Sequence, residues 1–72
     1  MLQADTRLRN RLKEARSLHG LTQAALAELA GVSRKTVNTV ENGVFVPSVF
    51  LALKLAHILN TTVEALFIIE TG

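Results

Sequence analysis

The 72-residue sequence contains no cysteine, tryptophan or tyrosine and only one proline. Without cysteine there is no disulfide framework and no thiolate metal site, which is typical of a reducing, intracellular setting. The two histidines, His19 and His57, are the remaining soft ligands, and they lie far apart in the sequence. We therefore predict no metal site and no cofactor.

Long hydrophobic runs are also missing. Charges interrupt the N-terminal segment MLQADTRLRNRLKEARS before an apolar run forms, and no stretch approaches the roughly 20 apolar residues of a membrane span. Its amphipathic pattern could touch anionic lipid, but the apolar stripe is needed for a core. We expect a cytoplasmic protein with no membrane partner.

Patterns that carry catalysis are absent as well. The sequence has no paired carboxylates, no Ser/His/Asp set, no phosphate-binding glycine loop and no HExxH spacing. Ser17, Ser33 and Ser48 fit helix-surface or helix-capping positions instead. The length predicts one domain, residues 1–72, with no room for a ligand-binding domain. We predict neither an enzyme nor a small-molecule substrate.

Positive charge is concentrated in the N-terminal half. Residues 1–40 contain seven Lys and Arg against three Asp and Glu, a balance of +4, whereas residues 41–72 contain one against three, a balance of −2. This asymmetry indicates an anionic partner, although an ordinary solvated helix face would also explain it. The hydrophobic content of 49% is high for a small protein, so another chain could cover part of the apolar surface.

Apolar spacing and helix-end signals predict an all-α fold of five helices. Leu8, Leu12 and Ala15 recur at helical spacing in the first of them. The helices are expected at about residues 6–19, 22–30, 33–42, 48–60 and 62–67. Capping residues mark the starts of the helices: Asp5 or Thr6, Thr22, Ser33, Ser48 and Thr62. Glycine or asparagine marks most of the ends: Gly20, Gly31, Gly43 and Asn60.

The fourth predicted helix is strongly apolar. Its spacing predicts an inner face made of Val49, Ala52, Leu53, Ala56 and Leu59 or Ile58. No strand, repeat or linker is predicted.

Residues 22–42 meet the steric demands of a helix-turn-helix, whose second helix enters the DNA major groove. Ala27 is small where the two helices would cross, and Gly31 allows the turn between them. Val37 and Val40 would hold the second helix against the core.

Arg34 and Lys35 occupy the first turn of that second helix. The positive end of the helix dipole disfavours cations there, by about 0.3–1 kcal/mol each when exposed. Phosphates and base acceptors would reverse this local field, so the pair predicts a helix end that points at nucleic acid. The alternative, two merely solubilising residues, stays open on spacing alone.

The stretch LKEARSLHGLTQAALAELAGVSRKTVNTVENG, followed by Pro47 and LALKLAHILNTTVEALF, resembles the lambda-repressor-like Cro/CI family of bacterial and phage regulators, also called the XRE family. The resemblance covers residues 12–67, and its motifs are specific as a set. It implies a compact five-helix lambda-repressor-like DNA-binding domain, in which the second and third helices form the helix-turn-helix.

The resemblance also implies roles for individual residues. Base readout falls to Arg34, Lys35, Thr36, Asn38 and Thr39. Contacts to the DNA backbone fall to Thr22, Gln23, Ser33, Asn42 and the N–H of Gly43. Arg16 and Glu41 correspond to a structural salt bridge. Chemistry supports the readers independently, since Arg and Lys donate to guanine, Asn pairs with adenine and Thr methyls meet thymine methyls.

The segment VFVPSVF departs from the family, which commonly has polar residues after Glu-Asn-Gly. Val44, Val46 and Phe50 are expected to be exposed and Phe45 partly buried, so an apolar patch at residues 44–50 would lie beside the DNA face. Such a patch suggests a protein partner.

The C-terminal run Leu66, Phe67, Ile68 and Ile69 carries no charge and is too long for so small a core to bury completely. Leu66 and Phe67 could belong to the core alone, whereas Ile68 and Ile69 are surplus to it. In relatives this region makes a two-fold contact, so we predict an isologous homodimer, with the tail 68–72 in the contact and extended. Two recognition helices about 34 Å apart would then read a palindrome.

Three functions compete at this point. The leading one is a sequence-specific regulator of double-stranded DNA, most simply a repressor. The second is a DNA-binding antitoxin or adaptor that acts through the 44–50 patch. The third is a protein-interaction module that keeps the fold but not the groove contact; the set Gln23, Arg34, Lys35 and Asn38 speaks against it.

Overall fold

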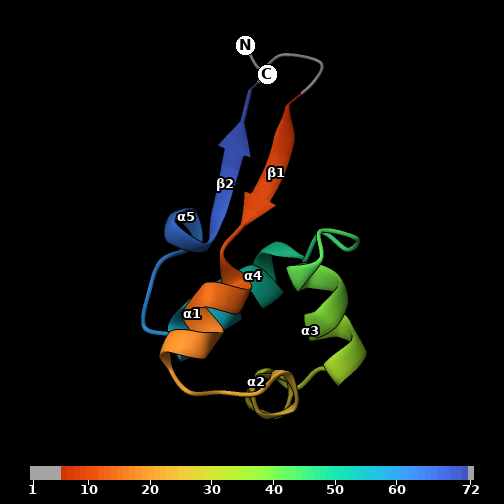
Figure 1. Cartoon of the computed structure of the whole chain (residues 1–72), viewed down its shortest axis with the longest axis vertical. Coiled ribbons are helices and arrows are strands. Elements are labelled where there is room, and N and C mark those ends of the chain that lie inside the picture. Colours follow the sequence, from red (N-terminus) through yellow and green to blue (C-terminus); the bar gives the residue numbers. More distant parts are fainter. Residues whose placement is uncertain (1–5, 72) are drawn as a thin grey trace.

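A computed structural model describes residues 6–71, so Asp5, one of the two predicted start signals, and Gly72, the end of the predicted tail contact, lie outside the described residues. Five helices form a body from which a two-stranded ribbon projects (Figure 1). None of the helices within residues 6–71 is long and apolar enough to cross a membrane. The elements in chain order are β1 (Arg7–Asn10), α1 (Leu12–Leu18), α2 (Gln23–Ala30), α3 (Arg34–Glu41), α4 (Val49–Ile58), α5 (Val63–Leu66) and β2 (Phe67–Glu70).

Helices α2 to α5 begin where the sequence predicts, because a hydroxyl side chain caps each of them. The side-chain oxygens of Thr22, Ser33, Ser48 and Thr62 each accept the backbone N–H of the residue three positions later. Gly31 ends α2 in the left-handed conformation, with φ of 70°, where a residue with a Cβ is disfavoured by about 1–2 kcal/mol.

The predicted all-α class is wrong, because segments near the two ends of the sequence pair as a small antiparallel sheet. Leu8 lies opposite Ile69 and Asn10 opposite Phe67. The first helix therefore begins at Leu12 and not near residue 6. The backbone of β1 is paired with the far end of the sequence, and local periodicity carries no information about such a partner.

Asn10 joins the ribbon to the helical body. Its Oδ1 accepts the N–H of Leu12 at 3.2 Å, which caps the start of α1. Its Nδ2 donates to the carbonyl oxygen of Val40 at 3.0 Å, near the end of α3. One side chain thus fixes the end of a strand against two helices.

The core contains side chains from all five helices. Val49 and Leu53, predicted for the inner face of α4, are exposed, and Leu51 and Leu55 are buried in their place. Because α4 is apolar on most sides, spacing could not select its buried face. Leu66, predicted at a dimer contact, also lies in the core. The largest fully buried side chains are Leu12, Leu26, Leu55, Leu66, Val37 and Val40.

Replacing Asn10 should destabilise the fold, because both of its hydrogen bonds end on backbone groups that remain in place. We expect Asn10→Ala to lower the free energy of unfolding by about 1–2 kcal/mol, measured by urea denaturation. Ser17→Ala, on the exposed face of α1, is the control and should change it by less than about 0.5 kcal/mol. Equal effects would show that Asn10 does not hold the ribbon to the body.

Candidate nucleic-acid interface

Helices α2 and α3 form a helix-turn-helix at the part of the body away from the ribbon (Figure 1). Ala27 is buried where they pack, and the N–H of Val32 donates to the Ala27 carbonyl oxygen at 3.0 Å. Val37 and Val40 face the core, as the sequence predicts. The orientation of α3 is therefore fixed by a buried small residue, a left-handed glycine and two valines.

The outer face of α3 carries the predicted base readers. Arg34, Lys35 and Asn38 are exposed, and together with Gln23 of α2 they line a hollow of about 260 Å³. The structure therefore gathers on one face the two cations at the N-terminus of α3, an amide one turn later and the first residue of α2. Donors of this kind match guanine O6 and N7 and the edge of adenine.

Several of the predicted DNA-contacting groups already have partners within the protein. Ser33 Oγ accepts the N–H of Thr36 at 3.1 Å, and Asn42 Nδ2 donates to Asn38 Oδ1 at 3.2 Å. The N–H of Gly43 donates to the carbonyl oxygen of Val40 at 3.0 Å. The Gly43 N–H therefore serves to close the end of α3, which argues against the phosphate contact expected there.

Glu41, the last residue of α3, accepts three hydrogen bonds. Arg16 Nε donates to its Oε2 at 2.6 Å and Arg16 Nη2 to its Oε1 at 3.2 Å, so the predicted pair forms a two-point contact. Gln23 Nε2 donates to Oε1 at 3.0 Å, and Arg16 Nη1 donates to the Leu21 carbonyl oxygen at 2.8 Å. These contacts tie α1 and the start of α2 to the end of α3.

The hydrogen bond to Glu41 raises the pKa of Arg16 above its ordinary value, against the opposing effect of burial. The guanidinium is therefore charged throughout the accessible pH range. The sequence paired Arg16 with Glu41 through the family resemblance, but it assigned Gln23 to DNA alone. The structure shows that Gln23 also holds the α3 carboxylate, which places its amide beside Arg34 and Lys35.

Lys54 of α4 is a positioning residue that sequence reasoning missed. Its Nζ donates to the carbonyl oxygen of Ala30 at 3.0 Å, at the C-terminal end of α2, where a cation is favoured by the helix dipole. The ammonium also lies 4.5 Å from the centre of the Phe50 ring. The signal for this role in the sequence is a lysine in the middle of a mostly apolar helix.

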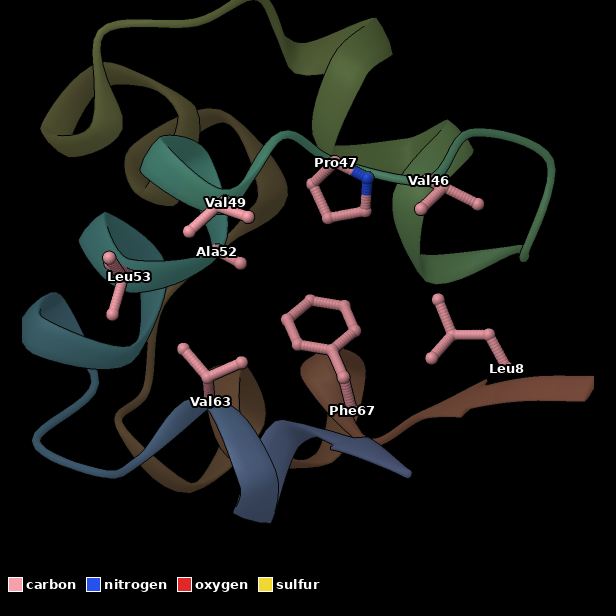
Figure 2. A pocket seen from close by; sticks show the side chains of 8 residues that line it. All are labelled: Leu8, Val46, Pro47, Val49, Ala52, Leu53, Val63 and Phe67. Atoms are coloured by element: carbon pink, nitrogen blue, oxygen red, sulfur yellow. The ribbon is translucent and has the colours of Figure 1, made fainter. Parts of the chain in front are cut away.

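An apolar groove lies away from the face of α3, between the ribbon and α4 (Figure 2). Its volume is about 250 Å³. Phe67 of β2 points into it from one side, and Pro47 lies opposite (Figure 2). The groove is lined by Leu8, Val46, Pro47, Val49, Ala52, Leu53, Val63 and Phe67, none of which is charged.

Among residues 6–71, no three His, Cys, Asp or Glu side chains gather closely enough to hold a metal ion. The outer face of α3 instead presents the exposed side chains of Arg34, Lys35 and Asn38 beside Gln23 of α2. In a comparison with known protein families, the family model described as helix-turn-helix (HTH_3) matches residues 12–66, which include this region. The chain belongs to the XRE-type helix-turn-helix family.

The curated relatives of this XRE-type protein are named as HTH-type transcriptional regulators. Among solved structures, hydroxypropylphosphonic acid epoxidase from S. wedmorenis also matches, with a TM-score of 0.70 and 34% identity over 75% of this chain but only 29% of that enzyme. An HTH-type transcriptional regulator of Methanocaldococcus jannaschii is 44% identical over 63 residues, which cover 88% of this chain and 96% of that protein. Regulators of this family bind double-stranded DNA.

Solved structures of the same family superpose on the helical body. The restriction-modification controller protein C.AhdI from Aeromonas hydrophila matches with a TM-score of 0.71 and 39% identity, over 75% of this chain and 82% of that one. SinR, a master regulator for biofilm formation solved in complex with DNA, matches with a TM-score of 0.70 and 29% identity, over 75% of this chain and 87% of the other.

Replacing Arg16 alone should destabilise the fold strongly, because it leaves the Glu41 carboxylate, whose side chain is only 2% exposed, without its cationic partner. We expect Arg16→Met to lower the free energy of unfolding by about 3 kcal/mol, and the double variant Arg16→Met/Glu41→Leu to lose less than the sum of the single variants. Urea denaturation of all three variants measures this coupling.

Arg9→Met is the matched control, because the Arg9–Glu70 pair has a similar contact distance of 3.0 Å but both side chains are about half exposed. It should change the free energy of unfolding by at most about 1 kcal/mol. Additive losses for Arg16 and Glu41 would contradict the proposed coupling.

Proposed function

We propose that this protein is a sequence-specific, dimeric transcriptional regulator, most simply a repressor, that reads a palindromic operator with α3 in the major groove. The observation that carries the proposal is the exposed pair Arg34 and Lys35 at the N-terminus of α3, beside Gln23. An anionic ligand at this end of α3 would offset the unfavourable field that both cations meet there. Double-stranded DNA in the cytoplasm is that ligand.

The proposed readers divide by chemistry. Arg34 and Lys35 donate to guanine, and Asn38 pairs with adenine through its Nδ2 and the remaining lone pair of Oδ1. Thr36 and Thr39 offer methyl groups to thymine. Contacts to the DNA backbone fall to Gln23 and Asn42. Thr22 and Ser33, which cap the starts of α2 and α3, contribute further contacts to the phosphates from these two helix ends.

Two features support a homodimer. Few cations face the DNA, so a single chain has only a small electrostatic contribution to affinity, and linking two copies raises the effective affinity. The groove also presents uncharged side chains, among them Leu53 and Phe67, and the exposed Ile69 pairs across the ribbon with Leu8 at the edge of the groove. Of the residues expected at the contact, Phe67, Ile68 and Ile69 keep exposed area, whereas Leu66 is in the core.

A second candidate function rests on the 44–50 patch. Val44, Val46 and Phe50 are all largely exposed, as the sequence predicts, and Phe45 is about half exposed. An apolar loop next to the DNA face would suit a DNA-binding antitoxin or adaptor that acts through a protein partner. In that case a partner chain and not a second copy would be needed for tight operator binding.

Selection of bound duplexes from a randomised pool at about 150 mM salt tests the function, because specific binding must outlast the screened phosphate contribution. Enrichment of a palindrome with half-sites about one helical turn apart supports the dimeric regulator. Enrichment of a single half-site supports the adaptor. No enrichment by folded protein overturns the dimeric regulator and favours the partner-dependent role, for which the 44–50 patch is the next surface to test.

Removing the cations at the start of α3 should weaken operator binding and relax its sequence preference. We expect Arg34→Ala and Lys35→Ala each to cost about 1–3 kcal/mol of binding free energy, measured by titration of the selected duplex. Arg9→Ala removes the same charge from the ribbon and should leave the preference unchanged. If Arg34→Ala and Lys35→Ala bind with unaltered preference, the readers are assigned incorrectly.

A lysine in the groove should abolish dimer formation without unfolding the chain. We expect Leu53→Lys, at a side chain that is 56% exposed, to sediment as a monomer at tens of micromolar, where the wild type is a dimer. Leu29→Lys is the matched control, because Leu29 is 58% exposed but lies on α2, outside the groove. Monomeric wild-type protein at that concentration would contradict the homodimer.

A further inference from the structure

A separate hollow lies between α3 and the loop that follows it. It has a volume of about 310 Å³, and we call it the α3 notch. Lys35 is its only charged lining residue. The notch is lined by Ser33, Lys35, Thr36, Thr39, Val44 and Phe45.

The hydroxyl groups of the α3 notch are all bonded within the protein. Thr39 Oγ1 lies 3.0 Å from the carbonyl oxygens of both Lys35 and Thr36, to which its hydroxyl donates. Ser33 Oγ and Thr36 Oγ1 are hydrogen-bonded to each other at 2.9 Å. The hydroxyl hydrogen of Thr39 is therefore committed within the protein, and toward a ligand this side chain presents its methyl group and hydroxyl lone pairs.

The loop side of the α3 notch is held in place by the backbone. The N–H groups of Val44 and Phe45 both donate to the carbonyl oxygen of Thr39, at 2.9 and 3.1 Å. Gly43 makes the turn in the left-handed conformation, with φ of 73°. These bonds hold the backbone of Val44 next to α3, and because Val44 remains 78% exposed, most of its apolar surface is uncovered.

We propose that the α3 notch binds the C5 methyl group of a thymine in the major groove, which makes Val44 and Phe45 specificity-determining residues. This proposal rests on the DNA binding proposed above. The thymine methyl is the apolar group that standard base pairs present in the major groove. Lys35 lines both the α3 notch and the hollow beside Arg34 and Asn38, and it supplies a positive charge that suits the DNA around the methyl group.

Replacing thymine by deoxyuridine removes that methyl group and changes nothing else in the base pair. Each thymine of the selected operator is replaced in turn, in both half-sites together, and binding is titrated at about 150 mM salt. Wild-type protein should lose about fourfold in affinity per half-site at one thymine position, the value expected for one methyl group taken out of water. Val44→Ala should reduce this loss at that position.

Leu18→Ala is the matched control. Leu18 is 88% exposed at the end of α1 and lines neither the groove nor the α3 notch. It should keep the full deoxyuridine penalty, because the ratio of affinities is taken within each variant.

The outcomes separate this proposal from the function on which it rests. Selective binding that is insensitive to deoxyuridine at every position overturns the methyl site and leaves the regulator intact. A penalty that Val44→Ala leaves unchanged also overturns it, because the methyl group is then read elsewhere. If no duplex is bound selectively, the proposed function itself fails.

Discussion

The carboxylate of Glu41 is the group on which the arrangement of the DNA-reading helices depends. It lies at the end of α3, and it accepts hydrogen bonds from Arg16 of α1 and Gln23 of α2. Three helices therefore meet at one nearly buried negative charge. All of its hydrogen bonds form only when the three helices are correctly placed. Arg16 also donates to the Leu21 carbonyl oxygen, which fixes the approach to α2. The geometry of the face around Arg34 and Lys35 follows from this charge.

The sequence predicted helices α2 to α5 well, because their signals are local. Ser33 and Gly31 fix helix ends through their own side chain or lack of one, and the family motifs place Arg34 and Lys35 on α3. The ribbon was not predicted, because its two strands are separated by nearly the whole chain and pair only in the folded structure. Likewise, only tertiary packing shows that Gln23 bonds to Glu41. Local spacing describes how a segment folds, but it does not identify its distant partners.

The loop after α3 gives the molecule two different apolar surfaces. Val46 and Pro47 line the groove that faces the ribbon, whereas Val44 and Phe45 line the α3 notch. A few consecutive residues thus connect the surface proposed for a second copy with the surface proposed for a base. The backbone N–H groups of Val44 and Phe45 are bonded to Thr39, so a short segment held on α3 borders both surfaces.

Pairing of β1 with β2 also sets an order of assembly. The helices depend mainly on contacts between neighbouring segments, whereas the Arg9–Glu70 contact closes a loop of 61 residues. During synthesis β1 leaves the ribosome early, and it has no strand to pair with until β2 is made. Leu8 and Phe67 form one wall of the groove, and this wall is consequently among the last parts of the molecule to fold. A nascent chain would complete its helix-turn-helix before it could present the groove to another molecule.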